Sequence, residues 1–121
     1  MDEALTVTVR HEPGVVIAAV TGEIDLSTVT GLRERLSGLT DSGRTLIVDL
    51  NRVTFIDSAG LGTLVSAARR AAAHGSSLHA VCARPQTRKL LWLTGVDRRI
   101  PLAATVDGAL MALAATGGAP G

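Results

Sequence analysis

Apolar and polar residues follow one another along the chain in a way that predicts a regular succession of strands and helices. Residues 5–10 alternate apolar and polar side chains, as a half-buried edge strand does. Residues 15–20 are apolar throughout and begin with β-branched side chains, which is typical of a central strand buried on both faces. Two more apolar runs, at 45–50 and 78–83, predict further strands, and a short extended piece is expected at 99–103.

Between these strands, apolar residues recur at the three- and four-residue spacing of a helix that packs on one side. The first helix is expected from near Ser27, with Asp25 or Ser27 capping its free amides. The second is expected to begin at Asp57 or Ser58. Their apolar positions are Val29, Leu32, Leu36 and Leu39 in the first helix, and Leu61, Leu64, Val65, Ala68 and Ala72 in the second.

Two further helices are expected in the last third of the chain. Pro85 suits the first turn of one of them, and Gly95 is expected to end that helix in the left-handed conformation. Thr105 can cap the last helix, which runs to about Ala115. The order of elements predicts an α/β fold with one mixed central sheet of about 4–5 strands packed with about four helices.

Length and composition indicate one globular domain over residues 1–121. The chain is 46% hydrophobic, and we expect a core over about residues 5–115 and a flexible tail at 116–121. The longest apolar runs, at 15–20 and 109–115, are much shorter than the ~20 residues of a membrane-spanning helix. The first residues are acidic, unlike a secretory signal. We therefore expect a cytoplasmic protein that does not bind membranes.

The charge balance and the single cysteine argue against several classes of function. The net charge is +1, from 12 basic and 11 acidic residues of interspersed sign, which argues against direct nucleic-acid binding. Trp92 lies in a leucine-rich helix, so a packing role is expected. The single cysteine, Cys82, allows neither an intramolecular disulfide nor a cysteine-rich metal cluster, and we interpret it as a small buried hydrophobe. No metal or cofactor is expected.

The segment VTFIDSAGLG, residues 53–62, holds the candidate chemistry, and three ordinary interpretations of it can be compared. A hydrolase nucleophile requires G-x-S-x-G, but Ile56 stands two residues before Ser58. A phosphate-binding loop requires a lysine that the segment lacks. A helix cap at Asp57 or Ser58 explains how the helix begins and needs no function. No motif places any of the histidines that could serve as a base, which are His11, His74 and His79.

Gly62 is the residue that a cap alone does not explain. Inside a helix, glycine costs about 0.5–1 kcal/mol relative to alanine. On a helical wheel Gly62 lies on the side opposite the apolar face. That side carries Ser58, Gly62, Ser66, Arg69 and Ala73. It therefore begins with a serine and continues with mostly small residues, so that another molecule can approach Ser58 closely.

Three segments together resemble a STAS domain of the bacterial anti-sigma-factor antagonist type. They are VTGEIDLSTVTGLRERL, LIVDLNRVTFIDSAGLGTLVSAARRAAAHGSSLHAVCA and PQTRKLLWLTGVDRRIPLAATVDGAL. The motif DSAGLG after an apolar strand is the most specific element, and TGEID before the first helix is the second. The resemblance covers about residues 5–115, nearly the whole chain.

The resemblance implies a regulatory binding protein rather than an enzyme. In this family the antagonist binds an anti-sigma factor and thereby releases a sigma factor. The ATP-bound anti-sigma factor is also a serine kinase, which phosphorylates the serine matching Ser58, and a serine phosphatase reverses the modification. The expected partner-binding residues are Glu23, Asp25, Asp57, Ser58, Ala59, Gly60, Gly62 and Ser66. A monomer or weak dimer is expected. The alternative is a STAS scaffold in a larger signalling assembly, without a phosphorylation cycle.

A phosphate on Ser58 is expected to leave the fold intact. It adds about −1.5 to −2 charges, and the amides of residues 59–61, which are expected to be free, together with the helix dipole tolerate an anion at this place. We expect it to block the partner by bulk and by repulsion, with Glu23, Asp25 and Asp57 nearby.

Overall fold

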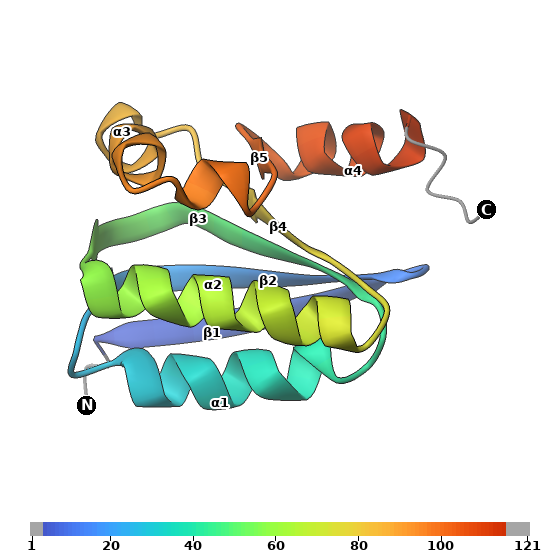
Figure 1. Ribbon diagram of the computed structural model, residues 1–121, viewed down its shortest axis with the longest axis horizontal. Coiled ribbons are helices and arrows are strands. Elements are labelled where there is room, and N and C mark those ends of the chain that lie inside the picture. Colours follow the sequence, from blue (N-terminus) through green and yellow to red (C-terminus); the bar gives the residue numbers. More distant parts are fainter. Residues whose placement is uncertain (1–3, 116–121) are drawn as a thin grey trace.

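The computed structural model describes residues 4–115, which form one α/β unit with a mixed sheet and four α-helices (Figure 1). The tail expected at 116–121 lies outside the described residues. The strands are β1 (Leu5–Glu12), β2 (Val15–Ile24), β3 (Thr45–Ile56), β4 (Leu78–Val81) and β5 (Leu102–Ala103). The helices are α1 (Val29–Thr40), α2 (Ser58–Ala73), α3 (Pro85–Leu93) and α4 (Val106–Ala115), with a short 3-10 helix η1 (Val96–Arg98).

The five strands lie in the order β1-β2-β3-β4-β5. The edge strand β1 is antiparallel to β2, because the two are joined by a tight hairpin, and every other neighbouring pair is parallel. Helical crossovers join the parallel strands, as parallel pairing requires. The mixed sheet predicted from the order of elements is therefore confirmed.

Helices cover both faces of the sheet, unequally. Helices α1 and α2 lie side by side on one face, where leucines such as Leu32 and Leu64 are almost completely buried (Figure 1). Burial of one such side chain contributes about 1.5–3 kcal/mol to stability. On the other face α4 packs through Ala109 against Ile17 and Ile47. This second contact explains why the central strands are apolar on both sides.

Strand β3 carries two extra residues relative to β2, both close to its carboxyl end. The pairing moves from Ala19 with Asp49 to Thr21 with Arg52, and again between Gly22 and Glu23. Such bulges change the direction in which the following side chains point. As a consequence Phe55, near the end of the strand, is 51% exposed instead of packed in the core. The sequence predicts this strand only over residues 45–50, whereas the structure continues it without a break to Ile56.

The start of α1 differs from the prediction. The helix begins at Val29 with Thr28 as its N-cap, and no side chain caps its amides. Asp25 and Ser27 instead form a turn before the helix, in which the Ser27 amide donates to Asp25 Oδ1 at 2.9 Å. A local side-chain turn therefore outcompetes the capping role.

Three other helix boundaries agree with the sequence. Pro85 lies in the first turn of α3, and Gly95 follows that helix with a φ of 77°. The Thr105 hydroxyl accepts a hydrogen bond from the Gly108 amide at 2.9 Å, which caps α4. Among the described residues, no helix combines the length and the apolar character needed to cross a membrane.

Two packing predictions are wrong and one is confirmed. Trp92 is 65% exposed, because the nine-residue helix α3 buries only Leu91 fully. Ala72 is exposed as well, since the buried side of α2 is turned towards Ala67 and Ala71. Cys82 is completely buried, as expected of a small hydrophobe.

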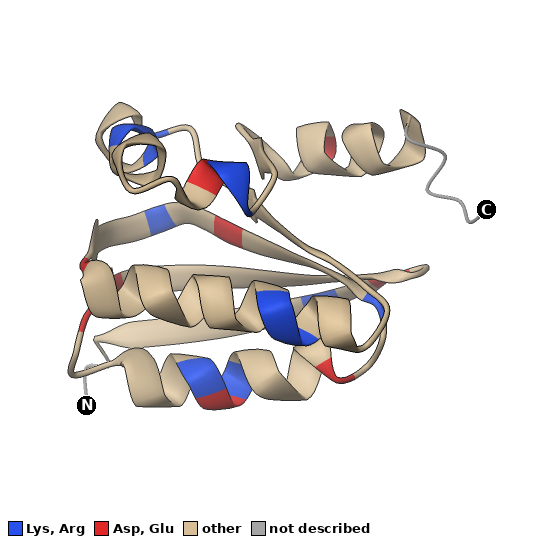
Figure 2. Cartoon of the chain, in the orientation of Figure 1, with Lys and Arg blue, Asp and Glu red and all other residues tan. Residues whose placement is uncertain are grey.

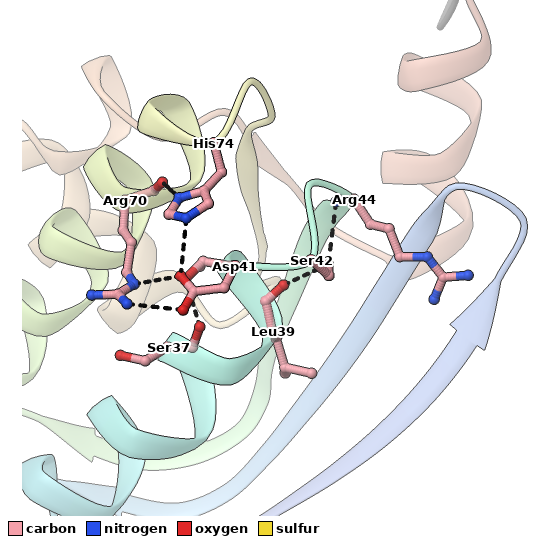
Figure 3. Close-up of polar contacts among 8 residues, drawn as sticks. Ser37, Leu39, Asp41, Ser42, Arg44, Arg70 and His74 are labelled. Atoms are coloured by element: carbon pink, nitrogen blue, oxygen red, sulfur yellow. Dashed lines mark hydrogen bonds and ion pairs between the residues drawn. The ribbon is translucent and has the colours of Figure 1, made fainter.

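Side-chain contacts join α1 to the edge strand β1 and to the neighbouring helix α2. Arg35 donates from Nη2 to the carbonyl of Val7 in the edge strand β1 at 3.0 Å. Asp41, at the end of α1, accepts hydrogen bonds from Nε and Nη2 of Arg70 in α2 at 2.6 and 2.9 Å, and His74 Nε2 lies 3.6 Å from the same carboxylate (Figure 3). Hydrogen bonding from Arg70 holds the pKa of Asp41 below its usual value.

Candidate functional site

The carboxyl ends of β2 and β3 lie next to each other and bring the two sequence motifs together. Ile24 pairs with Ile56, and the Asp57 amide donates to the Ile24 carbonyl at 3.1 Å. The Leu26 amide donates to Asp57 Oδ2 at 3.2 Å. The expectation that the TGEID turn lies near Ser58 is therefore confirmed, since parallel strands end at the same edge of the sheet.

Asp57 is the N-cap of α2, and Ser58 is its first helical residue. Asp57 Oδ1 accepts a hydrogen bond from the Gly60 amide at 3.0 Å, with the extended backbone that a capping residue requires. Of the three amides expected to face a phosphate, those of Gly60 and Leu61 already have partners, Asp57 Oδ1 and the Asp57 carbonyl. This corrects the expectation that all three are free.

The Ser58 side chain is exposed and chemically available. Its hydroxyl makes no hydrogen bond to any described residue. It lies at the amino end of a 16-residue helix, where the helix dipole favours negative charge. A hydroxyl in this position is accessible to a second protein. No base belonging to residues 4–115 hydrogen-bonds it, which is unlike the pairing of a catalytic serine.

Carboxylates surround this helix start. Glu23 is exposed at the end of β2, where it pairs with Phe55 of β3. Asp25 accepts hydrogen bonds at Oδ1 from the hydroxyl of Ser27 at 2.6 Å and from its amide at 2.9 Å. The Ser27 hydroxyl, and then its amide, lower the pKa of Asp25. Together with Asp57, these residues make the neighbourhood of Ser58 acidic (Figure 2).

The two glycines of the DSAGLG motif have different surroundings. Gly60 is buried, and a Cβ placed there would lie 2.5 Å from Ile24 Cγ2 and 2.8 Å from Ile56 Cγ1. A Cβ on Gly62 would meet nothing within 4 Å. Gly60, expected at the partner surface, therefore lies on the side of α2 that faces the sheet, where its missing side chain lets the helix approach both strands. Ala59 is half-buried and packs partly against the core.

The exposed side of α2 agrees with the helical wheel. Ser58, Gly62, Ser66, Arg69 and Ala73 are all exposed. The sequence did not identify two exposed apolar side chains near the ends of β2 and β3. Leu26, at 78% exposure, lies in the turn bonded to Asp57, and Phe55, at 51%, lies beside residues of α3. Leu26 offered a signal, because it is a lone leucine within a polar turn. Phe55 offered none, since its exposure depends on the β3 bulge.

The sequence and the fold were compared with those of known proteins. Residues 6–109 match the STAS domain family. The chain belongs to this family. One relative is the anti-sigma-F factor antagonist RsfB of Mycobacterium tuberculosis. It is 34% identical over 111 residues, which cover 89% of this chain and 88% of the relative. The anti-sigma-B factor antagonist of Bacillus subtilis is 29% identical over 104 residues, covering 86% and 95%.

A solved structure with the same fold is the anti-sigma factor antagonist from Mycobacterium paratuberculosis. Its TM-score is 0.84 at 32% identity, with 91% of this STAS domain and 94% of that chain covered. This protein, like the two relatives above, is named as an antagonist of an anti-sigma factor.

Replacing Asp57 by alanine tests how firmly this STAS domain holds the start of α2. We expect Asp57→Ala to lower the free energy of unfolding by about 1–2 kcal/mol, because the Gly60 amide loses its cap and the Leu26 amide loses an acceptor. Urea unfolding followed by circular dichroism measures the change. Asp57→Asn keeps one acceptor oxygen, which can still cap the Gly60 amide, but puts an NH2 donor opposite the Leu26 amide, so it should lose less stability than alanine and separates the two contacts. An alanine variant as stable as the wild type would contradict the assigned role.

Proposed function

We propose that the chain is an anti-sigma-factor antagonist that is switched by phosphorylation of Ser58. In its unmodified form it binds an anti-sigma factor that is also a serine kinase, and this binding releases a sigma factor. Phosphorylation ends the binding, and a separate serine phosphatase restores it. The observation that carries the proposal is the exposed, unbonded hydroxyl of Ser58 at the first position of α2. Relatives at 34% and 29% identity are named as antagonists of anti-sigma factors.

The surface around Ser58 suits a protein partner. Gly62 leaves the helix backbone uncovered, and Ser66 continues the small side chains along α2. Next to Asp57, Leu26 exposes apolar area, and removing that area from water by contact with another protein is favourable. Glu23, Asp25 and Asp57 add polar groups at the edge of the same surface. We infer that the partner covers the start of α2 and the turn after β2.

The chemistry at Ser58 is phosphoryl transfer in which this chain is the substrate. The Ser58 oxygen forms a bond to the γ-phosphorus of ATP, the bond from that phosphorus to the β–γ bridging oxygen breaks, and ADP leaves. A base on the kinase accepts the hydroxyl proton. The antagonist contributes the nucleophile in an accessible position and no catalytic group of its own.

Incubation with candidate anti-sigma factors and ATP tests the proposal. Each anti-sigma factor encoded in the same genome is mixed with the wild-type chain and with Ser58→Ala, and the products are analysed by mass spectrometry. We expect one phosphate on a peptide containing Ser58 and none on the alanine variant. Phosphate that persists on Ser58→Ala would refute the assignment of the site. Failure of every anti-sigma factor to bind the wild-type chain would refute the function.

A further inference from the structure

A groove between the outer sides of α1 and α2 is not part of the surface described so far. It has a volume of about 110 Å³. Its walls include Arg33 and Ser37 from α1, and Ser66 and Arg70 from α2, above an apolar floor that includes Leu36. Two arginines and two serines therefore contribute to the walls of one small, mainly apolar depression.

The hydrogen-bond donors of this groove are largely unused. Arg33 makes no ion pair or hydrogen bond to a described residue, and neither does the hydroxyl of Ser37 or Ser66. Arg70 uses Nε and Nη2 for Asp41, while its third nitrogen, Nη1, points away from that carboxylate (Figure 3). Several donors are thus available to one incoming acceptor.

The charges near the groove favour an anion. Two carboxylates are near: Asp41, which Arg70 already engages and which lies 3.6 Å from His74 Nε2, and Glu34, which directly follows Arg33 but makes no ion pair with a described residue. Arg33 has no such counter-charge, and Arg69 adds another positive group on the exposed side of α2. Blue segments lie in the middle of α1, with a red segment among them, and on the second half of α2 (Figure 2).

The groove is continuous with the surface around Ser58. Ser66 lies on its wall and also on the exposed side of α2 that begins at Ser58 and Gly62. Ser66 is two helical turns from Ser58, about 12 Å along the axis. A protein that covers Ser58 and extends along α2 therefore reaches the groove.

We propose that the α1–α2 groove receives an aspartate or glutamate side chain of the same anti-sigma factor that contacts Ser58. This proposal rests on the proposed function and specifies the partner's chemistry at a second place. A guanidinium matches a carboxylate with two parallel hydrogen bonds, and hydrogen bonds to charged groups are the stronger ones. Arg33 supplies the unpaired charge, Arg70 Nη1 adds a donor from the opposite wall, and the hydroxyls of Ser37 and Ser66 complete the donor set.

The test measures the dissociation constant of the complex with the anti-sigma factor that binds the wild-type chain in the experiment above. We expect Arg33→Glu to weaken binding by about tenfold or more, since a contact of about 1.4 kcal/mol corresponds to a factor of ten. Arg33→Lys keeps the charge but not the paired geometry and is expected to lose less, about threefold. Arg52→Glu makes the same charge change at an exposed position on β3 and should stay within about twofold, as a screened distant charge does.

Each result has a distinct meaning. If Arg33→Glu binds like the wild type while Ser58→Asp does not, the groove proposal is wrong and the proposed function stands. If Arg33→Glu and Arg52→Glu weaken binding equally, the effect is general attraction between charges and the specific contact is refuted. If inorganic phosphate at millimolar concentration abolishes the difference between wild type and Arg33→Glu, the groove is a site for small anions instead. If no anti-sigma factor binds the wild-type chain, both proposals fail. Thermal melts check that each variant is folded.

Discussion

Gly60→Ala is expected to destabilise the protein by about 2 kcal/mol, although alanine is the better helix former. The added Cβ would lie 2.5 Å from Ile24 Cγ2, 2.8 Å from Ile56 Cγ1 and 3.1 Å from the Ile24 carbonyl oxygen. These atoms belong to the buried ends of two neighbouring strands and cannot swing aside. Forcing extra volume into a packed core costs about 1–3 kcal/mol, which exceeds the helix-propensity gain of about 0.5–1 kcal/mol.

Gly62→Ala is the matched control, since it makes the same change two residues further along the same helix. Nothing lies within 4 Å of its new methyl group, so we expect a gain of about 0.5–1 kcal/mol from propensity alone. Thermal melts should show Gly60→Ala lower by roughly 10 °C and Gly62→Ala slightly higher. If Gly62 provides clearance for a partner, the stabilised variant binds the anti-sigma factor more weakly. Equal melting temperatures for both variants would contradict the packing role of Gly60.

Ser58→Asp is expected to abolish partner binding, by about a hundredfold or more, while leaving the fold intact. The side chain is exposed and its hydroxyl holds no contact within the described residues, so the substitution removes nothing from the native state. A negative charge in the first turn of a helix contributes about 0.3–1 kcal/mol of stability. Asp57, Asp25 and Glu23 oppose this gain, so the net change in melting temperature should be small. Bulk and like charge at an interface cost several kcal/mol.

Circular dichroism and binding measurements on the same samples separate these two effects. Ala112→Asp places the same charge on an exposed position of α4, which covers the opposite face of the sheet, and should leave binding unchanged. A large loss of helical signal in Ser58→Asp would mean that phosphorylation acts by unfolding. Intact structure with undiminished binding would remove Ser58 from the interface.

Local patterns were sufficient to predict most of the fold and the exposed surface of α2. The spacing of Leu61 and Leu64 determined which side of α2 faces the core, and therefore that Ser58, Gly62 and Ser66 face solvent. Apolar runs predicted the central strands, because these strands are buried on both faces. Residue chemistry also predicted the start of α3 at Pro85 and its end at Gly95.

What the sequence could not predict depends on contacts between distant segments. The packing role of Gly60 arises because Ile24 and Ile56, which are 32 positions apart, meet beneath it. The exposure of Phe55 follows from two extra residues in β3, which only the pairing with β2 reveals. The leucines around Trp92 predict a packing role for it. The nine-residue helix α3 buries only Leu91, however, and leaves Trp92 on its exposed side. The α1–α2 groove likewise exists only where two helices run together.

The hydrogen bond from Arg35 to the Val7 carbonyl bears on self-association. An edge strand of eight residues, such as β1, presents backbone groups to which another chain could add a strand and begin aggregation. Arg35 occupies one acceptor in that row and places a fixed positive charge beside it, so a strand approaching this edge would have to displace a cation. Helix α1 therefore lines the α1–α2 groove with Arg33 and, with Arg35, hinders the addition of a strand from another copy of the protein to the edge of the sheet.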